Sequence, residues 1–199
     1  MKTLDAIRDA LPDYARDLKL NLGSVLSGSG APGLTDRQIW AVAVAAAIAS
    51  RHVPLARDLE ALARAHLSDA ELDAARAAAA IMGMNNIYYR FLHLVEDGEY
   101  KQMPARLRMN VMANPGIDKL DFELLSLAVS AINGCGTCVA SHERQLRQHG
   151  VTREAVQSVA RIAAVIHAVA AVLEYQGGAG HAAQSAAADR GNAAHSAAA

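Results

Sequence analysis

Asn133-Gly134-Cys135-Gly136-Thr137-Cys138-Val139-Ala140-Ser141-His142-Glu143 contains both cysteines of the chain and a histidine four residues after the second. The Asn-Gly pair at its start is typical of a turn, so it predicts that the apolar run from Leu124 to Ile132 ends there and a new helix begins at the first cysteine. On that helix Cys135, Cys138 and His142 would lie on one face. The stretch therefore predicts a dithiol beside a histidine at a helix N-terminus.

The spacing of the two cysteines permits a reversible disulfide without large backbone movement, and the free N–H groups of a helix N-terminus favour the thiolate. The helix dipole favours Cys135 as the reactive sulfur. His142, one turn after Cys138, favours that second sulfur because it would take its proton. The spacing is equally consistent with a surface histidine beside Glu143 and Arg144. The pattern predicts redox chemistry and leaves the identity of the attacking sulfur open.

Other interpretations of the C-x-x-C motif need further partners. A zinc site would require His142 and either His149 or Glu123, although structural zinc usually takes four Cys or His ligands in two close pairs. Two inert buried thiols would pack well in a core. A thioredoxin domain would need strands around the motif, which this alanine-rich sequence does not predict. An α-helical dithiol site is the interpretation that remains, with no metal.

Glu123 is the one acidic residue in an otherwise apolar stretch, Phe122 to Leu127, that precedes the dithiol. Two roles are consistent with its position. It is either a residue of the first helical turn, favoured there by the helix dipole, or a carboxylate turned inward toward the cysteines. Spacing alone favours the first role.

The composition excludes several classes of protein. Of the 199 residues 52% are hydrophobic but only 4% are aromatic, so the apolar content is mostly alanine and aliphatic side chains, as in packed helices. We expect one all-α domain with no sheet. The net charge of −1, with acids and bases interleaved, argues against a nucleic-acid partner.

The sequence also predicts no membrane partner. The longest apolar runs, 39–49 and 162–173, are shorter than the ~20 residues that cross a bilayer. The first nine residues contain acids and no apolar core, so no secretory signal is predicted. A lone C-x-x-C without such a signal indicates a reducing compartment in which the dithiol cycles, and we expect a cytoplasmic protein.

Local signals predict where the helices lie. Thr35-Asp36-Arg37-Gln38 and Ser68-Asp69-Ala70-Glu71 are capping boxes, and the first opens a nearly all-apolar helix to about Ser50 that should be central. The other expected features are helices at 4–11, 13–26 (with Tyr14 on the apolar face), 54–66, 68–83 and 84–96, a subunit-packing surface of Tyr88, Tyr89 and Phe91, and a connector at 104–116 that lies against the core.

The two parts of the chain resemble each other in pattern. A shift of 85 residues lays the segment that begins at Thr35 on the one that begins at Leu120, and a shift of 84 lays Ser68 on Thr152. We interpret this as an internal duplication, with pseudo-repeats at about 35–96 and 120–176 in a single domain of residues 1–176. The shift places Cys135–Cys138 opposite Ser50–Val53, so only the second copy carries chemistry. Residues 177–199 are expected to be a disordered alanine- and glycine-rich tail.

Seven segments together resemble the alkyl hydroperoxidase D (AhpD) family of the carboxymuconolactone decarboxylase-like group. The resemblance extends over about residues 1–176. It is carried by Phe122–Leu124, Ala128–Cys135, Val139–Glu143, Leu18–Leu22, Ala79–Asn86, Leu107–Asn110 and Ala113–Gly116.

The resemblance implies an all-α subunit with a duplicated core, assembled as a homotrimer, and a role for each site residue. Cys138 would attack the peroxide, Cys135 would be its proton donor and resolving partner, and Glu123 with His142 would form a proton relay. The family commonly has histidine between the cysteines, where this chain has Thr137.

The resemblance also implies the reaction and its partners. The enzyme would be a lipoyl-dependent peroxidase that reduces alkyl hydroperoxides and regenerates a partner peroxiredoxin, AhpC. It would hold no tightly bound cofactor and would take electrons from dihydrolipoamide on a dihydrolipoamide acyltransferase, itself reduced by lipoamide dehydrogenase. The alternatives are a helical binding module stabilised by zinc or the dithiol, and a decarboxylase-like enzyme of the wider family.

Overall fold

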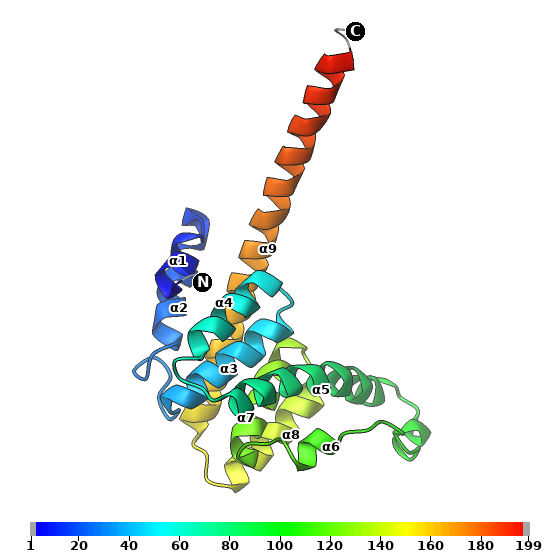
Figure 1. Ribbon diagram of the computed structural model, residues 1–199. Coiled ribbons are helices and arrows are strands. Elements are labelled where there is room, and N and C mark those ends of the chain that lie inside the picture. The colour runs from blue at the N-terminus through cyan, green and yellow to red at the C-terminus, as the bar shows by residue number, and fades with distance from the viewer. Residues whose placement is uncertain (1–2, 197–199) are drawn as a thin grey trace.

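The computed structural model describes residues 3–196, with side chains described as far as Gly177, and over this range every regular element is helical (Figure 1). The predicted all-α class, without a sheet, is confirmed for the described residues. The elements in chain order are α1 (Leu4–Asp9), η1 (Asp13–Ala15), α2 (Arg16–Val25), α3 (Asp36–Ala49), α4 (Val53–Ala63), α5 (Asp69–Leu94), η2 (Gly98–Lys101), α6 (Asn110–Ala113), α7 (Lys119–Ile132), α8 (Gly136–Gln148) and α9 (Arg153–Ser196).

Both predicted capping boxes are present. The N–H of Gln38 donates to Thr35 Oγ1 at 3.3 Å, and the N–H of Thr35 donates to Gln38 Oε1 at 2.9 Å. Ser68 and Glu71 make the same reciprocal pair at the start of α5. Each box satisfies backbone N–H groups that a helix N-terminus leaves without partners, which is why α3 and α5 begin where the sequence predicts.

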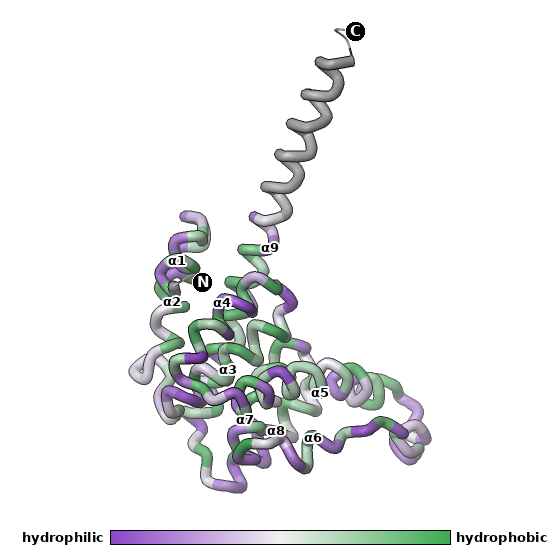
Figure 2. The backbone as a smooth tube through the Cα atoms, in the orientation of Figure 1, coloured by the Kyte–Doolittle hydropathy of each residue, from purple (hydrophilic) through white to green (hydrophobic). Residues whose placement is uncertain are grey.

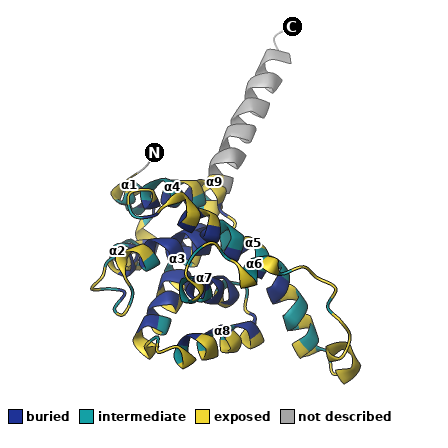
Figure 3. Cartoon of the chain, turned by 60° about the horizontal axis from the view of Figure 1, so that its bottom comes forward, coloured by how far each residue is buried: buried dark blue, intermediate teal, exposed yellow. Residues whose placement is uncertain are grey.

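Helix α3 is the centre of the fold, as its apolar sequence predicts. Every residue from Ile39 to Ala47 is buried, and the helix packs against α4, α5, α7 and α9. Figure 3 shows α3 and α7 in dark blue inside a shell of partly exposed helices, and Figure 2 shows hydrophobic colouring along α3 and α4. The small side chains of α3 let four helices approach it closely, and this explains the many alanines of the sequence.

The helix order can be compared with the expected duplication by laying α3, α4 and α5 on α7, α8 and α9. Helices α3 and α7 both have 14 residues, and their N-caps, Thr35 and Asp118, lie 83 positions apart. The N-caps of α4 and α8, His52 and Cys135, are also 83 positions apart. The connections agree as well, because Arg51 has φ 65° and Gly134 has φ 67°.

The predicted shift of 85 between the first helices is therefore wrong by two residues. It paired Asp36 with Asp121, but Asp36 is the first residue of α3 and Asp121 the third of α7. A helix that is apolar all round has no polar face to fix its register by sequence pattern. With the corrected register, the cysteine motif stands opposite His52–Leu55 instead of Ser50–Val53.

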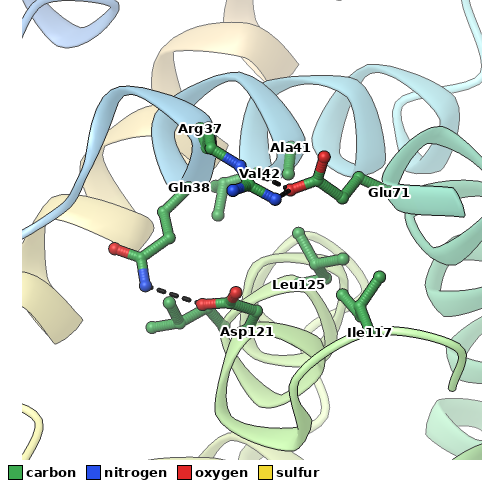
Figure 4. A pocket seen from close by; sticks show the side chains of 9 residues that line it. Arg37, Gln38, Ala41, Val42, Glu71, Ile117, Asp121 and Leu125 are labelled. Carbon is green, nitrogen blue, oxygen red and sulfur yellow. Dashed lines mark hydrogen bonds and ion pairs between the residues drawn. The ribbon is translucent and has the colours of Figure 1, made fainter. Parts of the chain in front are cut away.

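The two halves meet through equivalent residues (Figure 4). Gln38 Nε2 donates to Asp121 Oδ1 at 2.6 Å, and these positions correspond in the two halves. Beside them Arg37 Nε donates to Glu71 Oε1 at 2.8 Å, which joins α3 to α5. The cavity between these groups and the apolar side chains below them is only about 10 Å³, but the same four polar side chains also line an open depression of about 540 Å³. We interpret the contact between Gln38 and Asp121 as a joint between the halves, in which equivalent residues meet as they do across a two-fold axis.

Helix α5 differs from its prediction. It continues through Gly83 as one helix of 26 residues, where the sequence predicted an end near Gly83 and a second helix over 84–96. An interior glycine weakens a helix by only about 1 kcal/mol. Buried residues on both sides, including Met82 and Asn86, anchor the helix to the core across that position.

The end of α5 leaves the body of the molecule. Together with η2 and the chain after it, residues 87–107 form a projection that we call the arm, visible in Figures 1 and 3. The arm exposes six large apolar side chains: Ile87, Phe91, Leu94, Tyr100, Met103 and Leu107. After the arm, Met109, Val111 and Met112 are half-buried, as predicted for the connector, whereas Leu107 is exposed.

Two further expectations about apolar residues need correction. Tyr14 is exposed, since the short η1 turn directs it away from the core. Within the described residues one helical segment, Arg153–Gly177, is long and apolar enough to cross a membrane, with a mean hydropathy of 1.8, although no such segment was expected. Its apolar positions Val159, Ile162 and Ile166 are fully buried in the core, which is also typical of a central helix in a globular domain.

Helix α9 is assigned as Arg153–Ser196, and the expectation that residues 177–199 form a disordered tail stays a prediction. Alanine has the highest intrinsic helix propensity, so an alanine-rich segment that follows a helix tends to extend it. Residues 197–199 of the predicted tail lie outside the described residues.

Candidate redox-active site

The turn between α7 and α8 fixes the first cysteine. Gly134, with φ 67°, allows the chain to reverse, and the N–H of Cys135 then donates to the carbonyl oxygen of Ser130 at 3.1 Å. Cys135 is the N-cap of α8, and its Sγ accepts the N–H of Cys138 at 3.4 Å. The sequence prediction that a helix begins at the first cysteine is confirmed.

A buried amide network holds this turn against α5. Asn86 Nδ2 donates to Ser130 Oγ at 2.8 Å, and Asn133 Nδ2 donates to Asn86 Oδ1 at 2.9 Å. Arg90 Nη1 donates to the carbonyl oxygen of Asn133 at 2.7 Å. Sequence analysis did not identify this network, although two adjacent asparagines in an alanine-rich helix are a visible signal for it.

Cys135 and Cys138 form a disulfide, with an S–S distance of 2.24 Å and a Cα–Cα distance of 5.3 Å. The two sulfurs are thus paired as the spacing predicted. They differ in access, because Cys135 is 0% exposed and Cys138 is 6% exposed. This difference bears on which sulfur an incoming molecule reaches.

His142, on the same helix as Cys138, forms an ion pair or hydrogen bond with Glu123 of α7. His142 Nδ1 lies 2.6 Å from Glu123 Oε2, and both side chains are largely buried. The preference for Glu123 as a dipole residue was wrong, because it is the fifth residue of α7 and its carboxylate turns inward. His142 is likewise buried and is not a surface residue.

The carboxylate determines which nitrogen of His142 is available for proton transfer. An ionised carboxylate only accepts hydrogen bonds, so Nδ1–H donates to Glu123 and the neutral ring has its lone pair on Nε2. A histidine oriented in this way is a competent base toward a thiol and, once protonated, a competent acid. The arrangement therefore has the parts of a proton relay.

Cys138 opens into a cavity of about 400 Å³ between α5, the segment around α6, and α8. The cavity is mostly apolar with a few polar groups, as is usual for small-molecule sites. Cys135 is absent from its wall, whereas the exposed Thr137 contributes to it. Its wall consists of Met82, Asn85, Tyr89, Met109, Met112, Thr137, Cys138, Ser141 and His142.

Sequence analysis missed the α5 wall of this cavity. Met82, Asn85 and Tyr89 follow a spacing of three and four residues, so they share one face of the helix. That periodicity was a usable signal. It was obscured because the helix was predicted to break at Gly83, which would have separated Met82 from the other two.

Of the two zinc ligand sets considered from the sequence, the structure separates the one with His149, whereas Glu123 lies beside His142. His149 is the C-cap of α8, and its Nδ1 lies 2.9 Å from the carbonyl oxygen of Gln145. It stands at the opposite end of a helix about 20 Å long from Cys135. Within the part of the chain that the structure describes, no three His, Cys, Asp or Glu side chains cluster as a metal site would need.

Comparison with known proteins gives relatives over most of the chain. The carboxymuconolactone decarboxylase family matches residues 98–175, which include the dithiol, Glu123 and His142. Alkyl hydroperoxide reductase AhpD from Rhodospirillum centenum is 54% identical over 172 residues, covering 86% of this chain and 91% of that protein. The proteins of the same name from Frankia alni, 56% identical over 86% of this chain and 91% of that protein, and Streptomyces coelicolor, 54% identical over 86% and 95%, match equally broadly.

Proposed function

The chain belongs to the alkyl hydroperoxide reductase AhpD family of carboxymuconolactone decarboxylase-like proteins, and from that membership we propose that it is an antioxidant enzyme that reduces alkyl hydroperoxides through its dithiol. One observation carries the proposal most directly. Cys138 lies in the wall of the 400 Å³ cavity together with His142, whose ring is oriented by Glu123. A peroxide that enters there meets a sulfur and a proton relay at once.

The oxidative step begins with the thiolate of Cys138. It attacks the terminal oxygen of the hydroperoxide, so that an S–O bond forms, the O–O bond breaks, and two electrons pass from sulfur to the peroxide. The departing alkoxide takes a proton and leaves as the alcohol. Cys138 is then a sulfenic acid, which condenses with the thiol of Cys135 to give the disulfide and water.

His142 serves both proton transfers of this step. Its unprotonated Nε2 removes the proton of the Cys138 thiol, and the imidazolium, stabilised by Glu123, returns a proton toward the alkoxide. Cys135 is the resolving partner, whose thiol donates a proton and then forms the disulfide with Cys138. Access supports this assignment over the opposite one, which the helix dipole alone would favour, because Cys138 lines the cavity and Cys135 does not.

A partner supplies the reducing equivalents. We propose dihydrolipoamide, carried by a dihydrolipoamide acyltransferase and regenerated by lipoamide dehydrogenase, as the dithiol that reopens the disulfide by thiol–disulfide exchange. The lipoyl group acts as a substrate, so no tightly bound cofactor is required. The same dithiol would regenerate the peroxiredoxin AhpC. Such cycling suits a cytoplasmic enzyme, where disulfides are kept reducible.

The arm supports a homotrimeric assembly. Its exposed apolar residues, among them Ile87, Phe91 and Leu94, lie close together in sequence on a projection that leaves the body. Monomers rarely leave such groups uncovered. We propose that the arm packs against neighbouring subunits, which sedimentation of the wild type and of Phe91→Asp would test through loss of the trimer.

A coupled assay tests the proposed reaction. Purified protein receives cumene hydroperoxide, lipoamide, lipoamide dehydrogenase and NADH, and NADH oxidation is followed for the wild type and for Cys138→Ser. The proposal predicts turnover in the wild type and none in the variant. A binding module or a decarboxylase-like enzyme would show no peroxide-dependent NADH oxidation in either protein, and that result would contradict the proposal.

A further inference from the structure

A second cavity, of about 270 Å³, lies where the C-terminal ends of α3 and α7 meet α5 and α9. It shares no lining residue with the cavity beside Cys138. Its wall contains three basic side chains, Arg51, Arg90 and His167, and among the described residues no aspartate or glutamate. We call it the basic cavity, and the peroxide chemistry gives it no role.

The two arginines of the basic cavity lack a carboxylate partner. Neither Arg51 nor Arg90 forms an ion pair within the part of the chain that the structure describes. Arg90 donates one N–H to the carbonyl oxygen of Asn133 at 2.7 Å, which leaves most of its guanidinium donors for another acceptor. By contrast, Arg76 in the wall of the adjoining cavity is paired with acidic side chains of α4 and α5.

The backbone at Arg51 is unfavourable for an arginine. Its φ is 65°, in the left-handed region that side chains with a Cβ rarely adopt. The equivalent residue of the second half is Gly134, with φ 67°, and glycine takes this conformation without steric cost. The turn alone therefore favours glycine at position 51, so the arginine side chain needs a reason of its own.

Gly83 keeps the basic cavity open. Glycine in a helix interior is less favourable than alanine, and a Cβ added at Gly83 would meet no atom within 4 Å. Packing thus does not require glycine here, but Gly83 lies in the wall of the basic cavity, where a larger side chain would fill the space. At positions 51 and 83 the residue present stabilises the fold less than a simple alternative would, as is common at binding sites.

We propose that the basic cavity binds a small molecule through a phosphate group, which Arg51 and Arg90 hold. The planar fork of a guanidinium matches two oxygens of a phosphate, and two arginines balance its double charge. His167 adds a third polar contact, because its Nδ1 lies 3.3 Å from Ser50 Oγ and its Nε2 remains for a ligand. Ile87 and Ile132 form an apolar part of the wall, and the volume leaves room for a group attached to the phosphate.

The proposal is tested by the binding of inorganic phosphate, independently of any peroxide assay. Equilibrium dialysis with radiolabelled phosphate, at an ionic strength held constant with chloride, compares the wild type with Arg51→Gly, Gly83→Leu and Arg57→Ala. Arg51→Gly removes the guanidinium and relieves the backbone, whereas Gly83→Leu fills the basic cavity and keeps every charge. Arg57 is exposed on α4 outside the wall, so Arg57→Ala is a control with the same loss of charge as Arg51→Gly.

We expect saturable binding by the wild type and by Arg57→Ala, and an affinity at least about tenfold lower for Arg51→Gly and Gly83→Leu. Thermal unfolding should show both cavity variants to be folded, since neither substitution removes a packing contact. Absence of saturable binding by the wild type would overturn the proposal, and so would equal affinities in all the proteins. An equal loss in Arg57→Ala would assign the binding to net charge and would overturn it too.

Discussion

The two halves of the molecule have the same backbone at the position of the site, but only one carries chemistry. At a shift of 83 residues, Cys135 of the second half corresponds to His52 of the first, and Cys138 corresponds to Leu55. At the same shift His142 corresponds to Leu59, and Glu123 corresponds to Trp40. All four first-half residues are buried, as are the cysteines and His142.

The shared geometry includes the hydrogen bond at the helix start. In the first half the N–H of Leu55 donates to His52 Nδ1 at 3.1 Å, and in the second half the N–H of Cys138 donates to Cys135 Sγ at 3.4 Å. The N-cap position is thus a structural requirement that a histidine and a cysteine both meet. The difference between scaffold and site consists of four side chains and the cavity in front of them.

Transferring the dithiol to the first half gives the largest expected effect. The native dithiol is first removed by Cys135→Ser and Cys138→Ser. The two cysteines introduced into that protein by His52→Cys and Leu55→Cys should then form a disulfide with each other, since the backbone around both positions matches that of the native pair. Peroxide turnover should stay at background, because Trp40 and Leu59 stand where the proton relay would be.

Thiol titration and the coupled peroxide assay measure the two outcomes separately. Thermal unfolding of the four-residue variant serves as the folding control. Restored turnover would mean that a dithiol on this backbone suffices without the relay. Two thiols that stay free under mild oxidation would mean that the two turns are less alike than their dihedral angles suggest.

Removing the relay from the second half should have the next largest effect. Glu123→Gln and His142→Gln should each lower kcat by about 10²–10⁴, because the thiol proton and the alkoxide proton both need a positioned group. Stopped-flow measurement of the wild type and both variants over a range of pH checks this. Full activity in both would place proton transfer elsewhere in the site.

Features set by neighbouring residues could be predicted from the sequence, whereas contacts between distant helices could not. The helical class, the capping boxes at Thr35 and Ser68 and the helix start at Cys135 were predictable because each depends on residues within four positions of one another. The inward turn of Glu123 was not predictable from spacing, since it depends on His142, 19 positions away on another helix. The resemblance to the family supplied what local patterns lacked.

The two halves also differ at the N-terminal caps of α5 and α9, where the difference affects stability and not chemistry. Glu71 closes the capping box of α5, whereas Ala155 stands at the equivalent position of α9. Although burial raises the pKa of Glu71, hydrogen bonds from Ser68 and Arg37 hold that pKa below its usual value. We expect Glu71→Ala to lower the free energy of unfolding by about 2 kcal/mol near pH 7.

The effect of Glu71→Ala should depend on pH in a known direction. Because its pKa is lower in the folded protein, Glu71 stabilises the fold above its unfolded pKa, about 4.5, and this stabilisation is lost as the pH falls through the folded value. Urea unfolding from pH 7 to pH 3 measures the change. The exposed Glu154 provides the control, since Glu154→Ala should cost only about 0.5 kcal/mol. An equal loss at both ends of the pH range would mean that charge is not the cause.

The smallest expected effect concerns the residue between the cysteines. Thr137 is exposed at the wall of the cavity, and its hydroxyl does not titrate near neutral pH. Thr137→His would add a cation beside the sulfurs and should lower the kinetic pKa of Cys138 by about one unit, which corresponds to ~1.4 kcal/mol. Alkylation rates against pH measure this shift. Identical profiles for the two proteins would remove position 137 from the mechanism.

The features that could not be predicted from the sequence depend mostly on contacts between residues far apart in the chain. The register of the two halves depends on packing around an apolar α3, and the wall of the cavity depends on α5 remaining helical through Gly83. Neither follows from local pattern, because glycine and apolar runs are compatible with several arrangements.

Trapping the sulfenic acid tests most directly which half and which sulfur react. Reduced Cys135→Ser and Cys138→Ser are each treated with cumene hydroperoxide in the presence of dimedone, which labels sulfenic acids, and the labelled residue is identified by mass spectrometry. The account predicts rapid labelling of Cys138 in Cys135→Ser, because the resolving thiol is gone and the cavity still opens on the attacking sulfur. It predicts no comparable labelling in Cys138→Ser. Rapid labelling of Cys135 in that second variant would contradict it.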